Sequence, residues 1–170
     1  MMIVAWVAAA PTSAAAAPTR IVALGDSLTA GFGVAPEDAF PVRLQAWLKA
    51  HGVDAEVVNA GVSGDTTAGG LARLDWAMAE PADAVLVELG ANDALRALDP
   101  ADARKNLDAI LTRLDQRKVK ILLLGMKAPA NWGADYTSAF DAIYPALAEQ
   151  HHVLLRSEER RVGKECRYRW

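Results

Sequence analysis

The stretch Ile21–Ala30, IVALGDSLTA, decides the fold because it joins a buried strand to a helix through a short polar turn. Residues 21–25 form an apolar run with the length of a strand, and a helical pattern begins soon after Ser27. Ser27 is therefore expected at the carboxyl edge of a sheet, with an exposed hydroxyl and with backbone N–H groups facing any developing negative charge. The same residues also fit an ordinary Asp-Ser helix cap.

The rest of the chain alternates strand-like and helix-like segments. Strand-like runs fall near 21–25, 54–58, 83–89, 119–124 and 153–155, and helical patterns near 38–50, 66–79, 101–116 and 135–150. In the third helical pattern, apolar residues from Leu107 to Leu114 recur on one helix face, as a helix packed on a sheet requires. Trp76, in the second, is expected in the core. Strict alternation with short connections predicts an α/β fold with a doubly wound parallel sheet.

Two further blocks place polar loops after predicted strands. Asn59–Thr67, NAGVSGDTT, is a Gly- and Ser-rich turn, and Leu86–Asp93, LVELGAND, is an apolar run that ends in Gly90 and Asn92. The carboxyl ends of parallel strands meet at one edge of the sheet, where open α/β folds hold their sites. The three loops are therefore expected to converge.

With these three blocks in this order, the chain resembles the GDSL/SGNH hydrolases, in particular the bacterial multifunctional acyl-CoA thioesterases, arylesterases and lysophospholipases. The resemblance runs from about Arg20 to Leu155. It implies a flavodoxin-like, three-layer fold with five strands in the order 2-1-3-4-5, and the last helix of the family is expected to be missing. It also implies hydrolysis of carboxylic ester or thioester bonds through an acyl-serine intermediate, without a cofactor.

The resemblance assigns roles to three residues. Ser27 is the expected nucleophile, and the oxyanion hole would consist of the backbone N–H groups of Ser27 and Gly64 and the side-chain amide of Asn92. Glycine lets the backbone approach a substrate closely, and a neutral amide remains a donor at every relevant pH. The alternatives are a plain turn glycine and a loop asparagine that satisfies its own turn.

The loop Lys127–Tyr136, KAPANWGADY, follows the fourth predicted strand and lines the acyl pocket in related thioesterases and arylesterases. The candidate pocket residues are Asp26, Pro129, Asn131 and Trp132. A Pro- and Gly-rich connection with incidental aromatic residues is the alternative for this loop.

An activated serine needs a base, usually a histidine oriented by a carboxylate. In this family both come from an Asp-x-x-His motif after the fifth strand. The chain contains only His51, His151 and His152. His51 is expected to cap the end of a helix, and the other two precede the last strand without an aspartate three residues earlier. The catalytic Asp and His are therefore predicted to be absent from this chain.

The two ends of the chain differ from its centre. Residues 156–170, RSEERRVGKECRYRW, contain the only cysteine, show no apolar periodicity and resemble foreign or disordered sequence on a truncated gene. A basic arm for nucleic acid or membrane is the alternative. Residues 1–17 resemble a signal peptide with cleavage after Ala16, which predicts a periplasmic or secreted protein; a disordered Ala-rich leader is the alternative. Residues 18–155 form the predicted hydrolase domain.

The composition, with 52% hydrophobic and 23% charged residues, fits one domain with a sizeable core. Asp26 and Asp93 are expected to be helix caps, and no His, Cys or Asp spacing predicts a metal site. The expected partner is a small acyl ester or thioester, with no nucleic acid and no stable membrane insertion, and the oligomeric state stays open. One rival is a catalytically inactive acyl-ligand-binding domain. A nucleotide or phosphate binder is disfavoured because the glycines near Ser27 do not fit a G-x-G-x-x-G or P-loop spacing.

Overall fold

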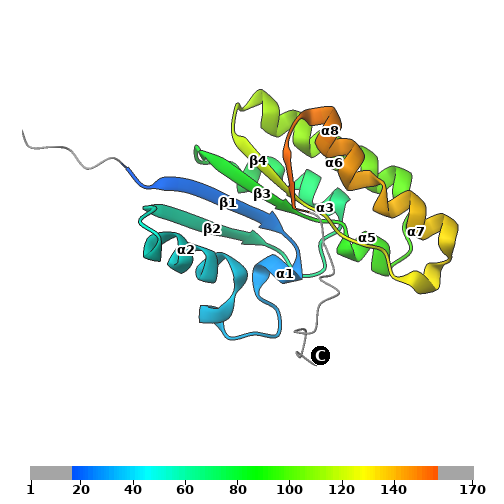
Figure 1. Cartoon of the computed structure of the whole chain (residues 1–170), viewed down its shortest axis with the longest axis horizontal. Helices are drawn as coiled ribbons and strands as arrows, with labels where there is room; N and C mark the ends of the chain where they lie inside the picture. The colour runs from blue at the N-terminus through cyan, green and yellow to red at the C-terminus, as the bar shows by residue number, and fades with distance from the viewer. Residues whose placement is uncertain (1–16, 157–170) are drawn as a thin grey trace, which may run out of the picture.

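The computed structural model describes residues 17–156. Its centre is a five-stranded parallel sheet in the order β2-β1-β3-β4-β5 (Figure 1). The strands are β1 (Thr19–Gly25), β2 (Ala55–Gly61), β3 (Ala84–Glu88), β4 (Lys120–Leu124) and β5 (Leu154–Arg156). The doubly wound parallel sheet and its strand order are confirmed. The predicted leader, except for Ala17, and the predicted tail after Arg156 lie outside the described residues.

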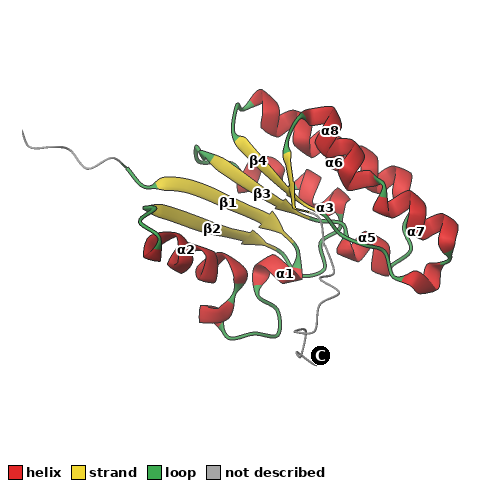
Figure 2. Ribbon diagram, in the orientation of Figure 1, coloured by secondary structure: helices red, strands yellow, loops and turns green. Residues whose placement is uncertain are grey.

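Helices cover both faces of the sheet (Figure 2). The α-helices are α1 (Ser27–Ala30), α2 (Phe40–Ala50), α3 (Thr67–Ala72), α4 (Leu74–Ala77), α5 (Ala91–Leu95), α6 (Pro100–Gln116), α7 (Ala134–Asp141) and α8 (Ile143–His151). The 3-10 helices are η1 (Pro36–Asp38) and η2 (Ala130–Trp132). None of the described helices is both long and apolar enough to cross a membrane.

Two of the predicted helices are each divided in two. The predicted helix 135–150 breaks between α7 and α8, because Pro145 has no N–H to donate to the carbonyl of Asp141. The predicted helix 66–79 breaks at Arg73, which stands between α3 and α4. Trp76 on α4 has 74% of its surface exposed, so the prediction that it lies in the core was wrong. Leu74 and Met78 point inward from this segment instead.

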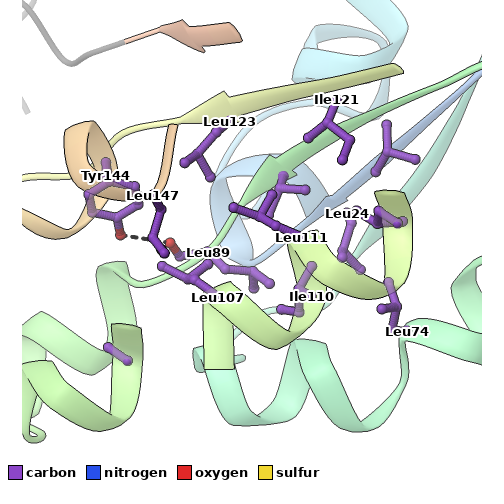
Figure 3. Packing of buried hydrophobic residues seen from close by; sticks show 14 of the residues in the cluster. Leu24, Leu74, Leu89, Leu107, Ile110, Leu111, Ile121, Leu123, Tyr144 and Leu147 are labelled. Carbon is purple, nitrogen blue, oxygen red and sulfur yellow. Dashed lines mark hydrogen bonds between the residues drawn. The ribbon is translucent and has the colours of Figure 1, made fainter. Parts of the chain in front are cut away.

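The main hydrophobic core lies on one face of the sheet (Figure 3). Alternate residues of the strands share this face, because successive side chains of a strand point to opposite sides. The strand residues of the core are Val22, Leu24, Ala60, Val85, Val87, Ile121 and Leu123, and the residues that α6 and α8 contribute include Leu107, Ile110, Leu111, Leu114 and Leu147. The apolar stripe predicted for α6 is therefore buried as expected. Burial of each such side chain is worth about 1.5–3 kcal/mol.

Tyr144 on α8 connects this core to the edge where the strands end. Its hydroxyl donates a hydrogen bond of 2.9 Å to the carbonyl of Leu89, drawn as a dashed line in Figure 3. A Cβ atom at Gly90 would lie 2.1 Å from the same hydroxyl, and Gly90 has a φ of +116°. Only glycine meets both conditions, so Gly90 fixes how the chain leaves β3 and enters α5.

Candidate active site

The turn after β1 holds Ser27 at the first position of α1. The carboxylate of Asp26 accepts a hydrogen bond of 3.0 Å from the backbone N–H of Leu28, which is the cap predicted from the sequence. Ser27 is partly buried. A Cβ atom at Gly61, on the neighbouring β2, would lie 2.3 Å from the backbone nitrogen of Ala30, so the helix packs directly on the backbone of that strand. The position of Ser27 is therefore set by the ends of two strands.

The loop after β2 carries Gly64 and is anchored through Arg73. Gly64 is exposed and has a φ of +85°, a conformation that favours glycine. The Arg73 guanidinium donates to the carboxylate of Asp65 at 2.5 Å. It also donates to the carbonyls of Ala60 and Gly25, both at 2.8 Å. Arg73 therefore ties the ends of β1 and β2 to the loop that holds Gly64.

The side chain of Asn92 joins all three loops. Its amide nitrogen lies 2.8 Å from the carbonyl oxygen of Asp65 and 3.1 Å from a carboxylate oxygen of Asp26. Asn92 itself lies in α5, which follows β3. The structure thus brings the Ser27 turn, the Gly64 loop and Asn92 to one edge of the sheet, as the order of the strands predicts.

A buried acid lies directly beneath the Ser27 turn. Glu88, the last residue of β3, is 5% exposed, and its Oε2 accepts a hydrogen bond of 2.8 Å from the Thr29 hydroxyl. The same oxygen accepts the backbone N–H of Asp26 at 3.3 Å. Burial, followed by the charge of Asp26, raises the pKa of Glu88 to about 7. Burial also raises the pKa of Asp26, which has no exposed surface. The sequence analysis missed Glu88, although an acid inside an apolar strand was a visible signal.

A second buried carboxylate holds helix α3 against α5. Asp93 accepts hydrogen bonds from the backbone N–H of Thr67 at 2.8 Å and from its hydroxyl at 2.6 Å. The amide of Asn106 donates to the same hydroxyl at 3.1 Å. Asp93 lies inside α5 and holds the first residue of α3 from there, whereas Thr66 is the N-cap of α3, so the prediction that Asp93 caps its own helix was wrong. Within residues 17–156, no group of three or more His, Cys, Asp and Glu side chains is arranged to hold a metal ion.

The candidate pocket residues separate into two environments. Pro129, Asn131 and Trp132 lie in the loop after β4, and 42% of the Trp132 surface is exposed. The loop continues into α7, where the Tyr136 hydroxyl donates 2.9 Å to the carbonyl of Leu98, so it lies beside the connection between α5 and α6. Asp26, in contrast, is fully buried and bonded to the turn. It supports the site from below and presents no surface to a substrate, which corrects its place among the pocket candidates.

The three histidines lie outside this group. His51 caps the end of α2, stacks on Trp47 with ring centroids 3.9 Å apart, and contacts the Trp47 carbonyl at 2.8 Å. His151 lies at the end of α8, with Nε2 2.6 Å from the carboxylate of Asp108. His152 caps the same helix just before β5 begins. Each histidine thus precedes a strand, at the end opposite to the Ser27 turn.

The fold and these contacts define a class: a three-layer parallel α/β protein with a serine at its first strand-to-helix turn and an asparagine from the loop after β3 beside it. The chain belongs to the GDSL-like Lipase/Acylhydrolase family, whose model matches residues 23–158.

Named relatives agree with this family. The chain is 43% identical over 145 residues to Esterase TesA of Pseudomonas aeruginosa, covering 85% of this chain and 72% of that protein. It is 40% identical to Thioesterase 1/protease 1/lysophospholipase L1 of Escherichia coli, covering 85% and 68%. Among solved structures, AlinE4, an SGNH-hydrolase family esterase, superposes with a TM-score of 0.81 at 47% identity, covering 84% of this chain and 77% of that one.

Proposed function

We propose that this chain is a hydrolase domain for carboxylic esters or thioesters that works through an acyl-serine intermediate on Ser27. The observation that carries the proposal is the hydrogen-bonded convergence of the Ser27 turn, the Gly64 loop and Asn92 at one edge of the sheet. Relatives named esterase and thioesterase support the same reaction class. The substrate is a small acyl ester or thioester, and the exposed loop with Pro129, Asn131 and Trp132 is the proposed wall for its acyl group.

In the proposed reaction the Ser27 hydroxyl oxygen attacks the carbonyl carbon and its proton passes to a base. The carbonyl oxygen becomes an oxyanion, which the N–H groups of Ser27 and Gly64 and the amide of Asn92 bind. Collapse of this intermediate breaks the bond to the leaving group, which takes the proton from the base and departs as the alcohol or thiol. Water, deprotonated by the same base, then attacks the acyl-serine, and the proton returns to the Ser27 oxygen as the carboxylic acid leaves. No hydrogen bond within the described part of the chain uses the N–H of Ser27 or Gly64, so both are available. An oxyanion would share the N–H that Asn92 donates to Asp26, the longer of its two contacts, so Asp26 continues to hold the amide.

We place the general base outside this chain. Residues 157–170 contain no histidine, and the three histidines of the described part precede strands at the opposite end of the sheet. The family resemblance implies an Asp-x-x-His pair after the fifth strand. β5 ends at Arg156, whose carbonyl accepts the N–H of Gly125 at 2.9 Å at the end of β4. A histidine that follows β5 would therefore emerge on the same edge as Ser27.

Hydrolysis of p-nitrophenyl butyrate tests both parts of this proposal in two forms of the protein. One form is the 170-residue chain. The other carries, after Arg156, the corresponding carboxyl-terminal segment of Esterase TesA. We expect slow turnover by the first form and fast turnover by the fusion, because Ser27 without a base is a weak nucleophile. Equal rates would contradict the assignment of the base, and a Ser27→Ala fusion with full activity would contradict the nucleophile.

The positions of the three histidines also favour a second function for the 170-residue chain itself, as a domain that binds acyl ligands without turning them over. Calorimetric titration with a 2-oxopentyl thioether, in which a methylene separates the carbonyl from the sulfur of a butyryl thioester and prevents hydrolysis, tests it. Saturable binding by the 170-residue chain, lost in a Trp132→Ala variant that unfolds at the same temperature, would support it.

We further propose that the protein is exported, from the leader-like composition of residues 1–17. Mass spectrometry of protein recovered from the bacterial periplasm tests this. A mature chain that begins at Ala17 is expected, and an intact amino terminus in the cytoplasm would contradict it.

A further inference from the structure

The proposed reaction assigns no role to the buried acid Glu88. Glu88 is the register partner of Gly25, the last residue of β1. Its Oε2 accepts hydrogen bonds from Thr29 and Asp26, whereas Oε1 is buried and has no hydrogen-bond partner within the described residues. A buried charged oxygen without a donor is costly, whereas a neutral carboxyl group can carry a proton at this atom.

The space below the Ser27 turn is built around this acid. A Cβ atom at Gly25 would lie 2.6 Å from Oε2 of Glu88 and 2.1 Å from the Thr29 hydroxyl. Thr29 has no exposed surface, and its hydroxyl donates to Glu88 at 2.8 Å. Glycine at position 25 therefore lets the strand end come close enough for the Glu88 carboxyl group to touch the backbone of the turn. The acid, at the end of β3, therefore packs directly against the turn that presents Ser27.

Asp26 is the second carboxyl group in this buried space. It accepts N–H bonds from Leu28 and Asn92, and such donors favour the charged form of an acid. Two adjacent buried carboxyl groups do not both ionise easily. Asp26 has an N–H donor on each of its oxygens, so Asp26 keeps the negative charge and Glu88 stays neutral. Burial and the charge of Asp26 raise the pKa of Glu88 to about 7, in agreement with a neutral Glu88.

We propose that Glu88 is a positioning residue: as a neutral acid it holds the backbone of Asp26 and the Thr29 hydroxyl, and so fixes the Asp26 carboxylate that orients the Asn92 amide toward the oxyanion. This inference rests on the proposed function. Ionisation of Glu88 places a second negative charge beside Asp26 and disfavours the oxyanion. The charged or titratable groups that face this pair from the surrounding elements are Asp65, Arg73, Asp93 and Tyr144.

The first test is the dependence of the catalytic rate on pH, measured on whichever of the two protein forms turns over. Glu88→Gln keeps the shape and the acceptor oxygen but cannot ionise. We expect a kcat close to that of the parent below pH 6 and a parent-to-variant ratio that falls as pH rises through about 7. Taking this ratio cancels the titration of the base. Glu88→Ala should lower kcat roughly 10- to 100-fold with little change in KM, because the turn is misplaced.

The second test is thermal unfolding of the 170-residue chain, which needs no activity. Below pH 4.5 the acid is protonated in both the folded and the unfolded state. Between 4.5 and about 7 the unfolded chain releases its proton while the folded chain keeps it, so the parent loses stability as pH rises through this window. Glu88→Gln should therefore gain Tm relative to the parent between pH 5 and 8.

The two tests separate the possible failures. A parent-to-variant rate ratio and a Tm difference that are both independent of pH would overturn the proposal. A Ser27→Ala variant that keeps its activity would overturn the proposed function, while the unfolding experiment would still report on Glu88. If Glu88→Ala does not fold, Thr29→Val, which removes one donor, gives the same comparison of kcat with KM.

Discussion

The two ends of the sheet use polar side chains in opposite ways. At the amino end, Arg20 pairs at 2.8 Å with Glu56 and with Glu80, whose side chains are 52% and 71% exposed. At the carboxyl end, Asp26 and Glu88 are buried and their pKa values are raised. Water screens the first set, so it adds little to stability. The second set is buried, and the loss of hydration of these carboxyl groups costs free energy of folding. Buried acids with raised pKa values are typical of functional sites.

Removal of the nucleophile is the strongest test of this contrast. In an active form of the protein, Ser27→Ala should lower kcat for p-nitrophenyl butyrate by about 10⁴–10⁶-fold, as for other serine triads. The matched control is His151→Ala, which breaks the contact with Asp108 outside the site and should leave kcat within about twofold. A large loss of kcat in the control would mean that the amino end of the sheet also contributes to catalysis.

The oxyanion hole gives the second largest effect. Asn92→Ala should lower kcat by roughly 10²–10³-fold with little change in KM, because the bond strengthens only in the transition state. Asn106→Ala is the matched control, since its amide donates to Thr67 away from Ser27. A change in KM alone would point to ordinary substrate binding by Asn92.

The sequence was a good guide to the fold because the signals there are local. The apolar runs place all five strands within a few residues, and the stripe from Leu107 to Leu114 identifies the face of α6 that packs on the sheet. The failures have non-local causes. Arg73 interrupts a helical pattern where its side chain reaches the ends of two strands. Trp76 looked like a core residue only because apolar neighbours surround it in the sequence.

The site was predicted in part for the same reason. Glycine-containing loops after strands indicate which edge of the sheet carries the site. The contact between the Ser27 turn and Asn92 was therefore predictable. The support beneath them was not. The contact of Glu88 with Thr29 joins residues 59 positions apart, and the burial of Asp26 depends on the packing of three loops. No pattern in one segment encodes either fact.

The contrast between the two ends of the sheet also predicts how much their polar side chains contribute to the free energy of unfolding. Arg73 and Asp65 are each 17% exposed, and Arg73 satisfies two carbonyls besides the carboxylate. Arg73→Met should lower the free energy of unfolding by about 2–3 kcal/mol, measured by urea denaturation, because it leaves the Asp65 carboxylate without its ion partner and removes one donor from each of the two carbonyls. The figure is below that for a fully buried pair, since some water reaches this one. A loss under about 0.5 kcal/mol would show that water replaces the arginine easily.

The same substitution at the other end should have the smallest effect. Arg20→Met removes two ion pairs, but Glu56 and Glu80 remain solvated when their partner is gone. The Nε atom of Arg20 is buried without a hydrogen-bond partner within the described residues. Its removal therefore also removes the free-energy cost of an unsatisfied buried donor. The free energy of unfolding should fall by less than about 1 kcal/mol, and the difference should shrink further in concentrated salt, which screens exposed pairs. A loss as large as that of Arg73→Met, unchanged by salt, would mean that the two ends of the sheet are held by the same kind of interaction.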